Sequence, residues 1–194
     1  MNLPWYTVVD CHERLDQRDI IPDCPVVTWA PGPITVGQGD DPIQAIVAAT
    51  EIVREDLVVM TQTCDLNHRK VTVVTLCRHH ALERVRQRWT LSMLDRGQSP
   101  SDRGWDAYCD GLREGRVPNC AMLNGADSTD PEMGHRIVEF ERAFTIPRDF
   151  LESWLSQTGQ RRLRLCPPYR EHLSQAFARY YMRVGLPTDI QKVW

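Results

Sequence analysis

Four polar side chains of different chemistry stand together in the sequence. Gln62, Thr63, Cys64 and Asp65 place an amide, a hydroxyl, a thiol and a carboxylate directly behind the apolar run 57–60. A cysteine becomes nucleophilic when a cation, a helix N-terminus or a general-base histidine favours its thiolate. One hypothesis is therefore a catalytic site at Cys64 and Asp65. The alternative is structural, with Cys64 as a small buried side chain and Asp65 accepting backbone N–H groups at a turn.

The general base for a catalytic Cys64 would have to be a histidine, and no spacing selects one. The negative charge of Asp65 opposes thiolate formation at its neighbour. The histidines available in the sequence are His68, His79, His80 and His135.

A zinc site is a further hypothesis for the same cysteine. Cys77, His79 and His80 are close in sequence, and a hairpin would bring Cys64 back towards them. Structural zinc sites normally show paired ligands at short spacing, which this chain lacks. Its seven cysteines are odd in number and widely spaced, which favours reduced thiols. We therefore expect neither a metal nor another cofactor, and the Gly37-x-Gly39 pair lacks the remainder of a phosphate-binding loop.

Arginine supplies nearly all of the positive charge, because lysine occurs only at Lys70 and Lys192. Guanidinium groups suit bidentate contacts to phosphate or carboxylate. Several arginines gather near the C-terminus and predict an anion-binding or nucleic-acid-binding face, with a solvated helix face as the alternative. These residues are Arg161, Arg162, Arg164, Arg170, Arg179 and Arg183.

The composition is that of a single globular domain. The chain has 194 residues, of which 42% are hydrophobic and 25% are charged, and a formal net charge of -3. That charge gives no global attraction to nucleic acid or anionic membranes. No apolar run reaches the length of a membrane span, and the N-terminus lacks the pattern of a signal peptide. We expect a cytoplasmic protein without a membrane partner.

The first part of the chain, residues 1–78, is predicted to be rich in β-strands. Proline-bounded apolar runs indicate short strands, and residues 43–53 are expected to form another one. Residues 57–63 and 71–77 predict a hairpin whose polar loop spans residues 65–70.

Residues 79–194 alternate between helical and strand patterns. An amphipathic helix is expected from His79, and a second short helix carries Trp105 and Tyr108 on one face. Residues 116–135 are rich in loop-forming residues. The remaining predictions are a strand at 137–140, a helix from Pro147 to Gly159, a strand at 161–165 and a long amphipathic helix from Pro168 to Gly185.

The expected fold is α+β. Its N-terminal half would be a small SH3-like β-barrel or a bent antiparallel sheet, against which the helices pack. The long C-terminal helix completes one domain spanning residues 1–194.

Part of the N-terminal half resembles the MazF/PemK-like toxin barrels. The similarity lies in Arg18-Asp19-Ile20-Ile21, the proline-bounded strand 24–29, Arg54 with the strand 57–61, and the strand 71–75. Arg18 stands where the family has glycine. The resemblance implies an SH3-like barrel, RNA as the substrate, and metal-free cleavage assisted by Arg54 and Thr75.

A second resemblance spans both halves of the chain. The string Thr61-Gln62-Thr63-Cys64-Asp65-Leu66 and the segment 168–177 (PYREHLSQAF) are similar to a group of uncharacterised bacterial proteins with a "TQSCDL" string and the same C-terminal helix. That likeness implies one cooperative unit and a bacterial conflict or antiphage setting. It indicates no activity.

Three functional hypotheses follow. The first is a component of a bacterial conflict, antiphage-defence or toxin-type system that binds a macromolecular partner, most specifically RNA through a MazF-like barrel. The second is a non-catalytic adaptor or regulatory subunit whose aromatic-rich elements, with Trp89, Trp105 or Trp154, and whose loop 116–135 contact another protein. The third is an enzyme that depends on Cys64 or on zinc.

Overall fold

A single antiparallel sheet organises the protein. The computed structural model describes residues 3–33, 35–37, 41–126 and 129–182. Within these residues seven strands pair in the order β1-β7-β2-β3-β4-β6-β5. The strands are β1 (Tyr6–Val9), β2 (Asp19–Trp29), β3 (Thr50–Val59), β4 (Val73–Ala81), β5 (Cys120–Leu123), β6 (Arg136–Pro147) and β7 (Arg162–Leu165).

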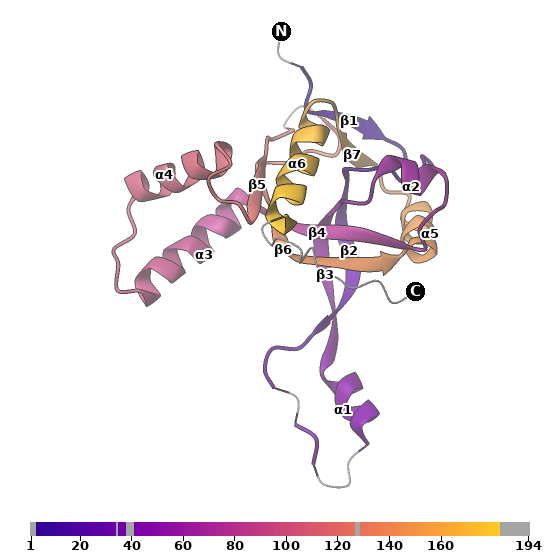
Figure 1. Cartoon of the computed structure of the whole chain (residues 1–194), viewed down its shortest axis with the longest axis horizontal. Coiled ribbons are helices and arrows are strands. Elements are labelled where there is room, and N and C mark those ends of the chain that lie inside the picture. Colours follow the sequence, from indigo (N-terminus) through magenta and orange to yellow (C-terminus); the bar gives the residue numbers. More distant parts are fainter. Residues whose placement is uncertain (1–2, 34, 38–40, 127–128, 183–194) are drawn as a thin grey trace, which may run out of the picture.

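Six helices accompany the sheet in the described part of the chain (Figure 1). They are α1 (Pro42–Ala48), α2 (Thr63–Asn67), α3 (Leu82–Asp95), α4 (Asp102–Arg113), α5 (Arg148–Thr158) and α6 (Tyr169–Tyr181).

The α+β class is confirmed, but the sheet is not closed into a barrel. Its edge strands are β1 and β5, which do not pair with each other among the described residues. The hydroxyl of Tyr6 on β1 donates to the carbonyl of Asn124, just beyond β5, at 2.7 Å. The bent antiparallel sheet is therefore the correct alternative. The sheet also extends beyond the N-terminal half, because β7 lies between β1 and β2.

Both faces of the central strands are buried. Side chains alternate between the faces of a strand, so Val58 and Leu57 enter different cores. Val58 packs with Phe140 and with Leu173 of α6, which covers one face. Leu57 packs with Leu151, because α5 covers the opposite face. This double burial explains the uninterrupted apolar run at 57–60.

Several predicted elements are confirmed. Residues 102–113 form α4, and α6 follows the expected stripe as far as Tyr181. Helix α5 ends where predicted, since Gly159 adopts a left-handed backbone with φ of 63°. The predicted continuation of the last helix to Gly185 lies outside the described residues.

Other predictions are wrong. Residues 42–48 form α1 instead of a strand, because Asp41 accepts the N–H of Ile43 at 2.9 Å and Pro42 suits a first helical turn. The helix expected from His79 begins at Leu82, since β4 continues to Ala81. The polar loop at 65–70 contains most of α2, and the loop 116–135 contains β5.

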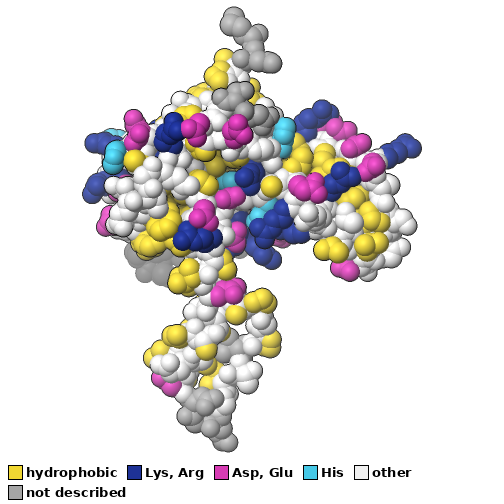
Figure 2. Space-filling view, turned by 180° about the vertical axis from the view of Figure 1, so that it is seen from behind, with side chains coloured by type: hydrophobic (Ala, Val, Ile, Leu, Met, Phe, Trp, Pro, Cys, Tyr) yellow, Lys and Arg dark blue, Asp and Glu magenta, His cyan; other side chains and the backbone are white. Residues whose placement is uncertain are grey.

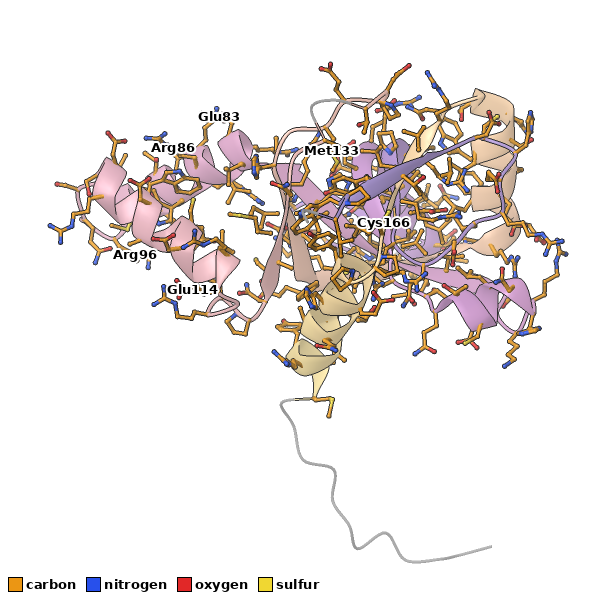
Figure 3. All side chains as sticks on the ribbon, turned by 90° about the horizontal axis from the view of Figure 1, so that it is seen from above. Glu83, Arg86, Arg96, Glu114, Met133 and Cys166 are labelled. Atoms are coloured by element: carbon orange, nitrogen blue, oxygen red, sulfur yellow. The ribbon has the colours of Figure 1, made fainter. Side chains whose placement is uncertain are left out.

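Two parts project from the body of the protein. The arm, which we define as residues 25–33, 35–37 and 41–54, is a two-stranded ribbon of β2 and β3 with α1 at its tip (Figure 1). The other projection is the pair α3–α4, which packs around Trp105 beside the sheet (Figure 3). In this view Glu83 and Glu114 lie at opposite edges of the pair. No helix in the described residues is long and apolar enough to cross a membrane.

Candidate functional site

The string 61–66 and the segment 168–177, which suggested the likeness to uncharacterised bacterial proteins, face each other across a pocket. Its volume is about 440 Å³. Gln62, Thr63 and Cys64 form one wall at the start of α2, and the first turns of α6 form the other. We call it the motif pocket. It is lined by Gln17, Gln62, Thr63, Cys64, Arg170, Glu171, Ser174 and Gln175.

The buried guanidinium group of Arg18 reaches the wall of the motif pocket. Arg18 is 1% exposed, and its Nη2 donates to Ser174 Oγ at 2.5 Å. Its Nη1 donates to the carbonyl of Val59 at 3.0 Å. The Nε of Arg18 has no hydrogen-bond partner among the described residues, nor does any described carboxylate form an ion pair with this guanidinium. Burial lowers the pKa of Arg18 to about 10.

The backbone of Arg18 is also unusual. Its φ of 68° lies in the left-handed region that side chains other than glycine rarely adopt. This is the position where the toxin motif has glycine. The backbone N–H of Arg18 donates to Val59 at 2.9 Å, which helps to hold this conformation. The protein therefore keeps a bulky cation at a position where glycine would fit more easily.

The neighbouring residue, Asp19, has the opposite surroundings. It is fully buried, and its carboxylate accepts from Arg162 Nε at 2.8 Å and from Arg164 Nε at 2.5 Å. Arg162 also donates to the backbone carbonyls of residues 10, 13 and 14. Arg162 is 0% exposed and therefore holds the N-terminal segment against β7.

The arginines that the sequence grouped near the C-terminus do not form one face. Arg161 pairs with Asp130, and Arg170 pairs with Glu171 at 2.8 Å. Because Arg162 is buried, the predicted anion-binding face loses a central member. Arg183 lies outside the described residues.

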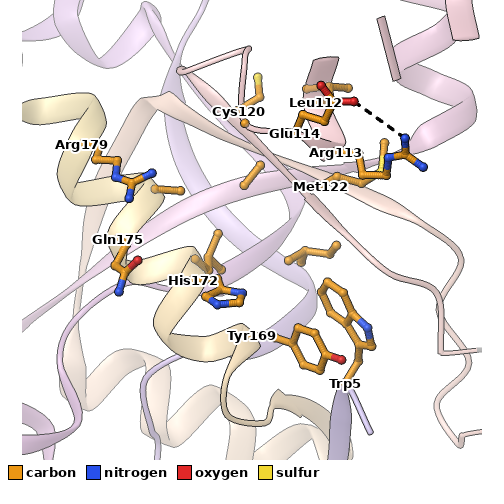
Figure 4. A pocket seen from close by; sticks show the side chains of 15 residues that line it. Trp5, Leu112, Arg113, Glu114, Cys120, Met122, Tyr169, His172, Gln175 and Arg179 are labelled. Carbon is orange, nitrogen blue, oxygen red and sulfur yellow. Dashed lines mark ion pairs between the residues drawn. The ribbon is translucent and has the colours of Figure 1, made fainter. Parts of the chain in front are cut away.

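Arg179 lines a second cavity, on another flank of α6 (Figure 4). There the rings of Trp5 and Tyr169 stack with centroids 3.8 Å apart. His172 and Gln175 extend from α6 into the same region (Figure 4). Of the five predicted arginines that the structure describes, only Arg170 lines the motif pocket.

Arg54 and Thr75 do not meet. Arg54 lies on the arm and pairs with Asp23 at 2.8 Å. Thr75 lies beside Met60, whose N–H donates to the Thr75 carbonyl at 2.8 Å. Six residues separate Arg54 from Met60, which corresponds to about 20 Å along an extended chain. The pair therefore does not form the shared centre that the toxin resemblance implies.

Cys64 is exposed, so the alternative in which it is a small buried side chain is wrong. Its Sγ lies 3.5 Å from Gln62 Oε1 and 3.7 Å from Asp65 Oδ1. No described histidine or arginine hydrogen-bonds to it. Thr63 Oγ1 donates to Asp16 at 2.5 Å, and Asp65 faces Lys70 at 4.0 Å. The thiol thus lacks the base and the cation that would activate it.

The zinc candidates are dispersed. Cys77 and His79 are buried within the sheet, whereas Cys64 is at the surface. His80 Nε2 lies 3.1 Å from Glu139 Oε2, and Arg88 donates to the same carboxylate at 2.6 Å. In the described ranges, the one group of three metal-ligating side chains within mutual reach is the exposed Asp10, Cys11 and His12.

Comparison of the chain with protein-family models, with curated proteins and with solved structures finds no match. A function for this protein must therefore be inferred from its own geometry.

Two residues of the motif pocket region were missed by sequence reasoning. Arg18 attracted notice only as the departure from a toxin motif, and Ser174 only as part of a helix. Ser174 follows Arg170 by one helical turn, which places both side chains on the same face of α6. That spacing was the signal in the sequence that could have placed Ser174 beside Arg170 in the site. The contact with Arg18 joins residues 156 positions apart, so no local pattern could show it.

Proposed function

We propose that this protein binds an anionic group of a macromolecular partner in the motif pocket, with an RNA phosphate as the first candidate. The observation that supports this proposal is Arg18. A buried charge is costly unless a counter-charge or a full set of hydrogen bonds compensates it. Arg18 forms no ion pair among the described residues, because Glu171 acts on its charge only from beyond ion-pair distance, and its Nε has no partner there. Its Nη2 contacts Ser174 in the pocket wall. A bound anion would supply the missing counter-charge.

The pocket wall suits such a ligand. Arg170 adds a second guanidinium, and the first turns of α6 contribute the positive end of a helix dipole. The side-chain amide of Gln175 supplies a further donor, whereas the hydroxyl groups of Thr63 and Ser174 already donate to Asp16 and to the carbonyl of Arg170. A volume of about 440 Å³ accommodates a group of nucleotide size.

Binding requires one local rearrangement. Arg170 Nη2 is 2.8 Å from Glu171 Oε1, so an incoming anion competes with that carboxylate. The side chain of Glu171 is 45% exposed and can turn into solvent. The exchange releases Arg170 for a bidentate contact. Glu171 thus acts as an internal substitute for the ligand.

RNA is the first source of the anion because the MazF/PemK-like resemblance implies an RNA substrate. The likeness carried by the two segments that form the pocket implies a bacterial conflict setting, which agrees with it. Recognition without cleavage fits the unactivated thiol and the separation of Arg54 from Thr75. Unpaired bases of a single strand would present further polar edges to the Gln62 and Gln17 amides. The adaptor hypothesis relied on aromatic side chains that are available at the surface. Trp89 and Trp105, however, pack against each other with ring centroids 5.6 Å apart.

The test is the binding of fluorescein-labelled single-stranded RNA, measured by anisotropy over a range of salt concentrations. Arg18→Met should weaken binding about tenfold or more, because a hydrogen-bonded charge is lost. Arg170→Met should also lower the salt slope by about one. Arg103→Met is the matched control, as this exposed arginine of α4 lies outside the pocket.

Two results would overturn the proposal. One is the absence of RNA binding at low salt. The other is equal binding by the wild-type protein and the Arg18→Met variant with folding intact. A labelled poly-glutamate peptide distinguishes the source of the anion: peptide binding that depends on Arg18, without RNA binding, excludes RNA as the partner.

A further inference from the structure

Three side chains of different donor chemistry converge at the turn that follows β1. Asp10 offers a carboxylate oxygen, Cys11 a sulfur and His12 a ring nitrogen, and these atoms all lie within 4.8 Å of one another. Ligand atoms that share one tetrahedral zinc ion lie about 3–4 Å apart, because the metal–ligand distances are about 2.0–2.3 Å. Small side-chain rotations would therefore bring the three atoms around a single ion.

The three side chains keep binding capacity in the fold. Asp10 accepts hydrogen bonds from the Cys11 thiol at 3.2 Å and from the His12 N–H at 3.1 Å, and both end on Oδ1, which leaves Oδ2 for a metal. No described residue hydrogen-bonds to the ring of His12. Asp10 and His12 are exposed and Cys11 is half-buried, so an ion can reach all three from solvent.

The backbone of this turn is held from outside by a buried arginine. Asp10 directly follows β1, and Arg162 of the neighbouring β7 donates to the Asp10 carbonyl at 2.8 Å. The same guanidinium group donates to the carbonyls of Glu13 and Arg14 at 2.8 and 3.0 Å. The three side chains therefore lie on a segment whose two ends are fixed, so that metal binding would order little further chain.

Two cavities adjoin the three side chains. Cys11 and His12 line one of about 500 Å³, and Asp10 and His12 line the other, of about 450 Å³. Glu13 and Arg14 line both cavities and bring opposite charges to them. Over the face of the protein shown in Figure 2, acidic and basic side chains are also interspersed. The affinity for a cation would therefore depend on the three ligands and not on a charged surface.

We propose that Asp10, Cys11 and His12 bind a divalent transition-metal ion, with Zn²⁺ as the first candidate and water at a fourth position. Sulfur, imidazole nitrogen and carboxylate oxygen are all zinc ligands, and three protein ligands with one open position are typical of catalytic zinc sites. The ion replaces the thiol proton of Cys11, which passes to solvent. Consecutive ligands do not show the paired spacing of structural zinc sites, on which the sequence prediction of no metal was based. The site lies outside the motif pocket, and the proposal is independent of anion binding.

The test uses the full-length chain, reduced and freed of metal with EDTA. Co²⁺ is the first probe, because a thiolate ligand gives it a charge-transfer absorption, and Zn²⁺ should then displace it. We expect one Co²⁺ per chain. Cys11→Ser should remove the absorption. Cys11→Ser and His12→Gln should each weaken Zn²⁺ binding about tenfold or more, since even the loss of an outer-shell partner costs about 10–100-fold.

Two variants serve as matched controls. Cys109→Ser removes a thiol that is half-buried like that of Cys11, and His135→Gln removes an imidazole that is exposed like that of His12. Both controls should bind Zn²⁺ as the wild type does. The melting temperature gives a second readout: Zn²⁺ should raise it for the wild type and the controls but not for Cys11→Ser. Circular dichroism establishes that each variant is folded.

A wild-type protein that shows no thiolate absorption with Co²⁺ would overturn the proposal. Equal Zn²⁺ affinity of the wild type and of folded Cys11→Ser would also do so, because it would show an adventitious ion only. Equal weakening by Cys109→Ser would likewise contradict it, since thiols would then bind the metal without selection. RNA binding should remain within twofold whether EDTA or Zn²⁺ is present, so the two proposals fail or succeed separately.

Discussion

Two buried arginines flank Asp19 in this fold, and their surroundings are opposite. Arg162 donates four hydrogen bonds, one to the carboxylate of Asp19 and three to backbone carbonyls. Arg18 is equally buried, yet its partners are a carbonyl, the sulfur of Met60 and the hydroxyl of Ser174. Its Nε lacks a partner among the described residues. One guanidinium is satisfied by the fold and the other is not.

The difference separates a structural cation from one that is available to a ligand. A charge whose donors are filled by the protein stabilises the native state and binds nothing else. A charge left without a counter-ion reduces stability unless something outside the chain completes it. Substitutions at the two positions should therefore have different effects on stability and on binding.

The largest effect is expected for Arg162→Met. The substitution removes one partner of Asp19 and one donor from each of three backbone carbonyls. The carbonyls of residues 10 and 14 still accept from the Glu13 N–H and from Arg164, whereas that of Glu13 keeps no donor among the described residues. We expect a loss of about 3–5 kcal/mol in the free energy of unfolding. Denaturant unfolding followed by circular dichroism measures it. Arg161→Met is the adjacent control, and its exposed pair with Asp130 should contribute less than about 1 kcal/mol. Equal losses for both variants would show that burial does not distinguish them.

Asp19→Asn tests the same network from the acidic side. The amide keeps the shape of the carboxylate but removes its charge, so Arg162 and Arg164 lose their shared counter-ion. We expect a loss of about 2–3 kcal/mol, the usual range for hydrogen bonds to charged groups. Asp23→Asn serves as the control, because its pair with Arg54 is exposed. A stability equal to that of the wild type would mean that the backbone carbonyls alone hold Arg162.

The sequence predicted much of the fold but misjudged Arg162. The alternation of arginine and leucine at 161–165 correctly predicted β7, and it suggested a strand with one solvated face. The structure places β7 between β1 and β2, where Arg162 is covered. Its counter-ion Asp19 is 143 residues away. Local periodicity carries no information about such a partner.

The errors in α1 and in the site have related causes. Ile43, Ile46 and Val47 are typical of strands, and this composition predicted one, whereas in the structure Asp41 caps a helix at the same place. The sequence likeness suggested that both segments of the motif pocket belong to one cooperative unit. Their contact, and the buried Arg18 behind Ser174, depend on how α6 packs across the sheet. Tertiary packing therefore decides which polar residues become a site.

A third test asks whether Glu139, which contacts both His80 and Arg88, stabilises the fold as the Arg162 network does. Burial raises the pKa of Glu139, but the hydrogen bonds and charges of His80 and Arg88 outweigh this and lower it from 4.5 to about 2. A carboxyl group whose pKa is lower in the folded state than in the unfolded state stabilises the fold at pH values above the unfolded pKa. This contribution is lost as the pH falls towards the folded pKa. Between pH 6 and pH 3 the loss should be about 2 kcal/mol.

Denaturant unfolding at several pH values checks this sign and magnitude. The Glu139→Gln variant should show a shallower fall in stability than the wild type over the same range. Parallel curves for the two proteins would contradict the assigned role of Glu139. His80 and Arg88 stay in place in this comparison, so only the titrating carboxyl changes.

The smallest stability effect is expected for Arg18→Met, although its side chain is as buried as that of Arg162. Methionine fills a similar volume and removes a charge that no described carboxylate balances, and such replacements are often neutral or stabilising. We expect a change within about 1 kcal/mol, in either direction. A loss as large as that of Arg162→Met would show that the fold itself satisfies Arg18.

Ligand-induced stabilisation completes the comparison between the two arginines. A ligand that binds only the native state raises the melting temperature, and the increase grows with the logarithm of the ratio of free ligand concentration to the dissociation constant. Single-stranded RNA should therefore raise the melting temperature of the wild-type protein and leave that of Arg18→Met unchanged. Arg161→Met should respond as the wild type does, because its side chain contacts Asp130 and not the motif pocket. The two guanidinium groups differ in function only if stability depends on Arg162 and the response to ligand depends on Arg18.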